Sequence, residues 1–306
     1  MSIQPCSEPR CAPRSRDGGA IELLIRSQPK DLGDFEVRRV LPARDRQRVG
    51  PFIFFDHMGP ARFAPGRGID VRPHPHIGLA TVTYLFDGAI QHRDSLGFDQ
   101  RITPGAVNWM TAGRGIVHSE RTPQDLRREG SALHGLQVWL ALPAEAEETT
   151  PSFVHHPEAD LPRVRSRGAS LTLIAGEAWG ERSPVETASQ TFYAVGELES
   201  GAQIALPGDV PERAVYLVEG EVALEGETLS PGTLAVVRAG ARPVLTAARA
   251  SRVALAGGAA LEGERHLWWN FVSSSAERIE QAKRDWRDGR FPGVPGDPES
   301  IPLPSD

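Results

Sequence analysis

Cysteine is scarce in this chain: only Cys6 and Cys11 occur among 306 residues. One such pair, with no histidine beside it in the sequence, is weak evidence for a metal site or a disulfide framework, and we expect both thiols to be incidental. A run of about 18 apolar residues, the length of a transmembrane helix, is also missing. The N-terminus has no apolar segment like that of a signal peptide. The sequence therefore predicts a cytoplasmic protein without a membrane span.

Neither sign of charge dominates the sequence. Lys and Arg number 34, Asp and Glu number 40, and the formal net charge is −6 at pH 7. Proteins that bind nucleic acid present a basic patch or stripe, and here the basic residues are scattered among the acidic ones. We therefore expect no direct binding to nucleic acid. The hydrophobic fraction of 40% is enough to bury a sizeable core.

Short apolar runs between turn residues are what the chain has in abundance. The 31 glycines and 26 prolines separate segments such as 81–86, 107–110 and 136–140. Short strands between turns are typical of a β-sandwich or barrel. The second half repeats the theme, because residues 214–222 resemble residues 83–90. The sequence therefore predicts an all-β protein made of two similar barrels.

We expect four parts along the chain. Residues 1–19 are predicted to be a flexible N-terminal tail, residues 20–147 the first barrel, and residues 148–273 the second barrel. The boundary between the barrels is placed in the acidic, proline-flanked stretch that follows the last strong strand of the first half. Residues 274–306 are predicted to form a helix followed by an extended, proline-stiffened tail.

The helix is predicted from two patterns. Ser274 and Glu277 have the spacing of an S-x-x-E capping box, and Ile279, Ala282 and Trp286 recur on one helical face. A single apolar stripe is the usual signature of a helix that covers a core. We therefore expect this amphipathic helix to pack on a barrel, with docking onto a partner protein as the alternative.

Three histidines and one glutamate in the first half are the candidate metal ligands. His74 and His76 lie two residues apart, as do His118 and Glu120. Side chains two residues apart on a strand point to the same face, so two such strands side by side would make one site. Imidazoles with a carboxylate, and without thiolates, suit a divalent first-row metal. Four protein ligands leave open positions on an octahedral ion, which favours chemistry on a bound molecule over a structural role.

The other histidines are less suited to this set. His57, His92 and His134 lie in the same half and could contact the site, but we expect each to be a hydrogen-bonded structural residue. His155 and His156 are adjacent, so in a strand they face opposite ways and cannot chelate one ion together.

The histidine segments resemble the cupin superfamily. Its first motif has two histidines in an H-x-H pair, a glutamate further on, and a glycine at each end. The positions that match this spacing are Gly68, His74, His76, Thr81 and Gly88, with threonine in place of the glutamate. Gly115 and His118 match the second motif, and Glu120 follows two residues later. The missing carboxylate has therefore moved to the second motif.

This relocation resembles the pirin family within that superfamily. The resemblance to pirins extends along residues 35 to 304. The segments that carry it are 49–52, 55–60, 73–88, 92–95, 109–115, 135–139, 268–272, 290–292 and 301–304. The tail segments are similar to bacterial members in particular. The resemblance is specific in the first half and weaker between residues 150 and 260.

The resemblance implies two tandem cupin (jelly-roll-like) β-barrels, of which only the first binds metal. His74, His76, His118 and Glu120 would be the ligands, with Fe(II) as the expected ion and Mn, Ni, Cu, Co or Zn as alternatives. No histidine occurs between His156 and His266. The second barrel therefore cannot form the same metal site, and we expect it to be structural, with a binding function as the alternative.

Pirins are associated with quercetin 2,3-dioxygenase activity, so the resemblance implies ring cleavage of an aromatic flavonol by dioxygen. Glu120 is then a candidate general base as well as a ligand. The main alternative is a non-enzymatic, metal- or redox-dependent regulator that binds a transcription factor or a metabolic enzyme. A third interpretation is a metal-dependent isomerase or another small-molecule enzyme of the cupin class. A monomer is expected.

Overall fold

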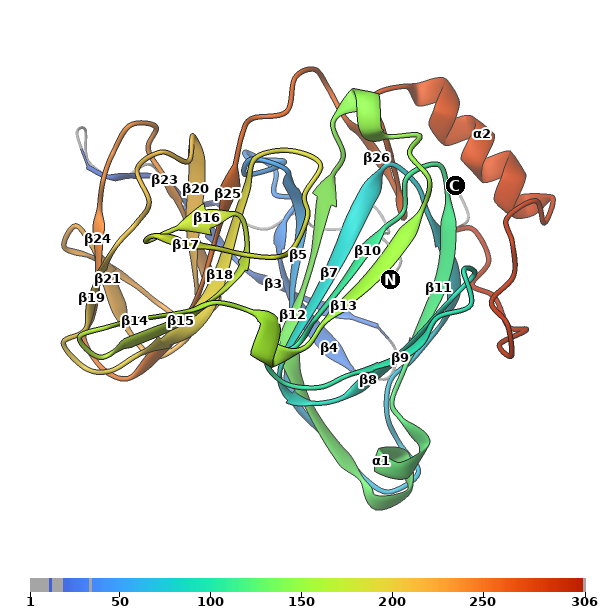
Figure 1. Ribbon diagram of the computed structural model, residues 1–306, viewed down its shortest axis with the longest axis horizontal. Helices are drawn as coiled ribbons and strands as arrows, with labels where there is room; N and C mark the ends of the chain where they lie inside the picture. The colour runs from blue at the N-terminus through green and yellow to red at the C-terminus, as the bar shows by residue number, and fades with distance from the viewer. Residues whose placement is uncertain (1–10, 13–18, 33–34, 305–306) are drawn as a thin grey trace.

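The computed structural model describes residues 11–12, 19–32 and 35–304, and their regular structure is mostly β-strand (Figure 1). The strands form four large sheets, two in each half of the chain. The α-helices of the described residues are Gln124–Glu129 (α1) and Ala276–Arg287 (α2). Neither has the length and apolarity needed to cross a membrane. The predicted all-β class, with one amphipathic helix near the C-terminus, is confirmed.

The first half consists of two facing sheets. Its strands are β3 (Gln28–Asp31), β4 (Glu36–Leu41), β5 (Phe52–Phe63), β6 (Asp70–His76), β7 (Leu79–Gly88), β8 (Ile90–Asp94), β9 (Asp99–Ile102), β10 (Val107–Thr111), β11 (Ile116–Arg121), β12 (Ser131–Ala141) and β13 (Ser152–His156). The larger sheet has the order β13-β10-β7-β12-β5-β4-β3, and the smaller has the order β6-β11-β8-β9. No hydrogen-bonded ladder joins the two sheets within the described residues, so this half is an open, cupin-like sandwich and not a closed barrel.

The second half repeats this plan. Its larger sheet contains β1 (Cys11–Ala12), β2 (Ile21–Arg26), β23 (Thr233–Val237), β20 (Glu212–Glu219), β25 (Ser251–Gly258), β18 (Thr191–Leu198), β15 (Ala169–Ala175) and β14 (Arg163–Ser166), in that order. Its smaller sheet contains β19 (Gln203–Ala205), β24 (Val244–Ala247), β21 (Val222–Leu224) and β22 (Glu227–Leu229). A hairpin of β16 (Glu177–Ala178) and β17 (Glu181–Arg182) forms a separate two-stranded sheet. Leucine, valine and alanine side chains make up most of the core between the sheets.

Two strands each pair with a strand on the other side of the domain boundaries predicted from the sequence. β2 joins β23 of the second half, and β13 joins β10 of the first. A shared apolar core also crosses from one half to the other, with the rings of Phe55 and Tyr216 5.0 Å apart. Of the predicted N-terminal tail, residues 1–10 and 13–18, with Cys6, lie outside the described residues, and β1 pairs with β2. The two halves therefore form one folded body.

A buried histidine lies in the contact between the halves. His57 Nδ1 is 2.9 Å from the hydroxyl of Tyr216 in the second half, and His57 Nε2 is 2.8 Å from His134 Nε2. Burial, with the charge of Arg38 as the next cause, lowers the pKa of His57 to about 2. Both histidines therefore have the structural, hydrogen-bonded role expected of them.

The lowered pKa of His57 predicts that the protein loses stability as the pH falls below 6.5. Because the folded-state pKa is lowered, the unfolded chain binds one more proton than the folded chain between pH 6.5 and about 2. The stability that the neutral ring contributes is complete above pH 6.5 and declines by about 1.4 kcal/mol for each pH unit below it. Urea unfolding at several pH values should show a shallower decline for His57→Gln than for the wild-type protein. Identical slopes would contradict this assignment.

The C-terminal segment packs on the first half. The hairpin of β26 (His266–Trp268) and β27 (Phe271–Ser273) lies beside the end of β6, where the amide of Val272 donates to the carbonyl of Ile77 at 3.2 Å. Helix α2 covers this hairpin with Ile279 and Ala282, as its apolar stripe predicted (Figure 1). The tail then returns past β6, where the amide of Ile301 donates to the carbonyl of Pro73 at 2.8 Å.

The predicted capping box was wrong by one residue. Ser275 is the N-cap, and its hydroxyl accepts from the amide of Arg278 at 3.3 Å. The hydroxyl of Ser274 instead donates to the buried carboxylate of Glu147 at 2.9 Å. The competing carboxylate comes from a distant part of the chain, so the local spacing did not reveal it.

Candidate metal centre

The three predicted histidine ligands meet in the first half. Strands β6 and β11 are antiparallel neighbours, with His74 opposite His118. The centroids of the three rings lie 4.4 to 5.0 Å apart, and His76 Nε2 is 3.1 Å from His118 Nε2. One ring nitrogen from each histidine lies within 4.8 Å of the others. No other group of this kind is found in the part of the chain that the structure describes.

Each of these rings has a partner at Nδ1, on the side away from the cluster. His74 Nδ1 is 2.8 Å from the carbonyl of Arg72, and His76 Nδ1 is 3.2 Å from the carbonyl of Asn270. A carbonyl accepts only, so both rings carry their proton on Nδ1 and leave Nε2 unprotonated. Nitrogen lone pairs that converge in this way, with the second ring nitrogen held by an outer partner, fit a divalent transition metal.

Burial also keeps these rings neutral, which is the form that binds metals. The exposed fractions of His74, His76 and His118 are 2%, 1% and 1%. Burial lowers the pKa of His76 to about 3 and lowers those of His74 and His118 well below the ordinary value. An aromatic side chain supports the cluster from behind, because the ring of Trp139 lies 5.0 Å from that of His76 and stacks on Phe54 at 4.0 Å.

Glu120, the fourth predicted ligand, lies on the same strand but outside the group of three. Its side chain is buried, and Oε1 accepts from the amide of Gln137 at 3.3 Å and from the hydroxyl of Thr83 at 3.4 Å. The register of β11 against β6 shifts between His118 and Glu120. The two-residue spacing therefore does not give Glu120 the same position relative to β6 that His118 has. Burial raises the pKa of the Glu120 carboxyl. A cation nearby would favour the ionised carboxylate and so would lower this pKa.

His92 also reaches the cluster, where the sequence favoured a structural role. Its Nδ1 is 3.4 Å from His118 Nδ1, and its Nε2 is 3.0 Å from the carboxylate of Asp94. The sequence allowed this contact as the alternative, because His92 lies in the same half of the chain as the candidate ligands. His155 lies outside the cluster and bonds Asn108 at 2.7 Å.

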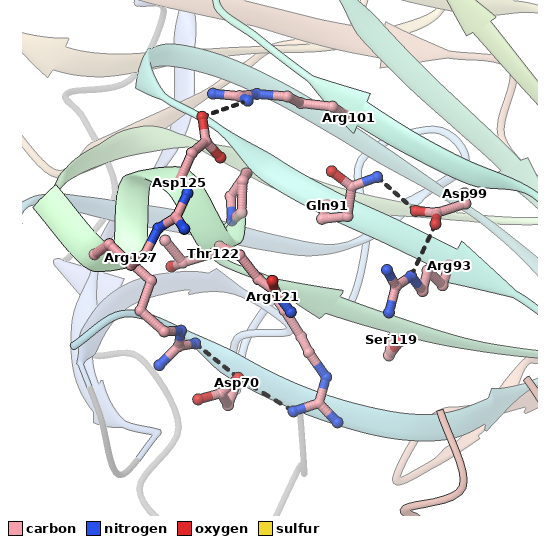
Figure 2. A pocket seen from close by; sticks show the side chains of 13 residues that line it. Asp70, Gln91, Arg93, Asp99, Arg101, Ser119, Arg121, Thr122, Asp125 and Arg127 are labelled. Carbon is pink, nitrogen blue, oxygen red and sulfur yellow. Dashed lines mark hydrogen bonds and ion pairs between the residues drawn. The ribbon is translucent and has the colours of Figure 1, made fainter. Parts of the chain in front are cut away.

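An open pocket of about 690 Å³ lies on the opposite face of β11 (Figure 2), where Ser119 and Arg121 are found. Four arginines around it are paired with carboxylates, in the pairs Arg93 with Asp99, Arg101 with Asp125, and Arg121 and Arg127 with Asp70. These ion pairs satisfy much of the local charge. The pocket contains none of the three clustered histidines, whose convergence makes their cluster the candidate metal centre.

Known proteins match both halves of this chain. Residues 34–140 match the Pirin family, and residues 193–292 match the Pirin C-terminal cupin domain. A pirin-like protein of Caulobacter vibrioides is 51% identical and covers 93% of this chain and 99% of its own length. A Pseudomonas aeruginosa protein, provisionally named a quercetin 2,3-dioxygenase, is 40% identical over 84% of this chain and 80% of its own. The crystal structure of a quercetin 2,3-dioxygenase from Acinetobacter baumannii has a TM-score of 0.86 and 32% identity, covering 92% of this chain and 94% of its own.

Proposed function

The chain belongs to the pirin family of two-domain cupin proteins, and on that premise we propose that it is a metal-dependent dioxygenase that cleaves the ring of a flavonol such as quercetin. The observation that carries the proposal is the convergence of three neutral imidazoles in the first half. The names of the Pseudomonas and Acinetobacter relatives support the substrate class. Dioxygen is the co-substrate in this proposal, and the protein acts as a monomer in the cytoplasm.

His74, His76 and His118 would hold one divalent metal through Nε2, and Glu120 would complete the ligand set or act beside it. Fe(II) is the proposed ion, with Mn, Ni, Cu, Co or Zn as alternatives. When bound, such an ion would supply Lewis-acid chemistry for a substrate oxygen and for dioxygen. The two carbonyls that fix the tautomers of His74 and His76 keep those donors aimed at one point.

Glu120 is the proposed general base. Its buried carboxylate lies two residues along β11 from His118, and the Gln137 amide donates to it. A carboxylate held in this way can take the proton of a flavonol hydroxyl onto its oxygen as the substrate binds. If the same carboxylate were bound tightly to the cation it would be a poor base, so this role requires an oxygen that is free of the metal.

Oxygen consumption tests the proposal. Protein loaded anaerobically with Fe(II) should take up dioxygen when quercetin is added, and the visible absorbance of quercetin should fall in parallel as its ring is cleaved. The doubly substituted His74→Ala, His118→Ala protein, treated in the same way, should do neither, because it retains one of the three imidazoles. A lack of uptake by wild-type protein with metal bound would overturn the flavonol assignment and favour the regulatory alternative or another substrate class.

A further inference from the structure

The outer partner of His118 differs in kind from those of the other two clustered histidines. His74 and His76 each donate to a main-chain carbonyl, which can only accept. His118 Nδ1 instead faces His92 Nδ1 at 3.4 Å. An imidazole nitrogen accepts only when it carries no proton, so the tautomer of His92 decides which nitrogen of His118 is left for a metal.

Asp94 sets the tautomer of His92. The carboxylate is fully buried, and its Oδ1 accepts from the amides of Leu96 and Phe98 at 2.9 and 3.2 Å. Its Oδ2 is 3.0 Å from His92 Nε2. An ionised carboxylate accepts only, so His92 Nε2 must donate, and in the neutral ring Nδ1 is then the acceptor.

Packing fixes the plane of the His92 ring. The ring of Phe153 stacks on it with centroids 4.3 Å apart and 15° between the planes. Strand pairing fixes the backbone as well, because β8 and β11 are neighbours with Asp94 opposite His118 and His92 opposite Glu120. The three side chains therefore form a buried row that runs from Asp94 through His92 to His118.

We infer that His92 and Asp94 are positioning residues that hold His118 in the tautomer whose Nε2 faces the metal. The Nδ1 proton of His118 is donated to His92, and the Nε2 proton of His92 is donated to Asp94. Neither residue is in the predicted ligand set or in the group of three imidazoles. The inference rests on the metal centre of the proposed function but not on the flavonol substrate.

Three substitutions separate this role from simple packing. His92→Phe keeps a ring stacked on Phe153 but removes the acceptor for His118. His92→Asn loses the ring, whereas its Oδ1 can stand where Nδ1 stood and accept from His118. Asp94→Asn keeps an oxygen for the turn amides but turns an N–H toward His92, which reverses the tautomer. His155→Phe is the matched control, because His155 is half-buried and bonds Asn108 outside the cluster.

Zinc ion alone is the probe, and its affinity is measured by competition with a chelator. His92→Phe and Asp94→Asn should bind zinc about 10- to 100-fold more weakly than wild type, as is usual when an outer partner of a ligand histidine is lost. His92→Asn should lose less affinity than His92→Phe, and His155→Phe should match wild type. A merely structural role predicts the reverse order for the two His92 variants, because phenylalanine preserves the packing better.

Nitrogen-15 NMR of the zinc-loaded protein reads the tautomers directly. Wild-type His118 should be protonated at Nδ1 and His92 at Nε2 only, and Asp94→Asn should move the His92 proton to Nδ1. Wild-type zinc affinity in His92→Phe, or a proton on His92 Nδ1 in the wild-type protein, would overturn the inference. Failure of wild type to bind zinc would overturn the metal centre itself, and this inference with it. Zinc binding with the predicted tautomers but no oxygen uptake would overturn the flavonol function alone.

Discussion

Replacing His118 with alanine should reduce the bound metal from about one ion per chain to none that can be measured after dialysis. The ring supplies one of three converging nitrogens, and its Nε2 lies 3.1 Å from that of His76. His74 and His76 would remain, with Glu120 as the possible third ligand, but the buried imidazole that closes the group of three would be gone, so the ion should be lost to water and buffer during dialysis. Every metal-dependent activity should disappear with the ion.

Metal analysis after reconstitution with Fe(II) or Zn(II) measures this effect. Because His118 is buried, the circular dichroism and melting temperature of the metal-free variant should be recorded to show that it folds. His155→Ala is the matched control, a histidine of the same half that bonds Asn108 and should leave the metal content unchanged. A full complement of tightly bound ion in His118→Ala would contradict the proposed site.

Replacing Glu120 with glutamine should lower kcat by about 10²- to 10⁴-fold, the usual contribution of a general base, while most of the metal is retained. Glutamine has the same shape as glutamate and can still accept from the Gln137 amide and the Thr83 hydroxyl, but it does not take up a proton. Glu120 is not part of the group of three imidazoles, so those imidazoles would continue to hold the ion.

Steady-state kinetics and metal analysis on the same preparation distinguish the two roles of this carboxylate. Glu129→Gln is the control, because that glutamate is exposed on α1. If Glu120→Gln lost turnover and metal to the same extent, the base role would be wrong and only the ligand role would remain.

Local spacing predicted that His74 and His76 point the same way, and the structure brings both together with His118. His74 and His76 share a face because strand geometry repeats every two residues, and that rule holds wherever the strand lies. The rule is less informative for Glu120, because β11 shifts register against β6 after His118. The shift occurs where Arg72 and Pro73 lie on the partner strand, and proline has no amide hydrogen to offer the ladder. A spacing rule that assumes regular pairing does not detect such an irregularity.

Long-range pairing explains what the sequence did not reveal. The partner of His76 is the carbonyl of Asn270, which lies 194 positions further along the chain. Long-range pairing also places β2 in a sheet of the second half and β13 in a sheet of the first. Composition and periodicity describe each strand by itself, whereas its neighbour in a sheet is decided by the whole fold. The C-terminal helix was predicted because its apolar stripe is a local signal.

The account depends on one metal ion held by three imidazoles, and the most direct test is the crystal structure of metal-loaded protein with anomalous scattering recorded at the absorption edge of the metal. We expect one anomalous peak about 2.1 Å from the Nε2 atoms of His74, His76 and His118. An occupied site elsewhere, coordination through Nδ1, or no peak at the cluster in protein that retains its metal would contradict the account.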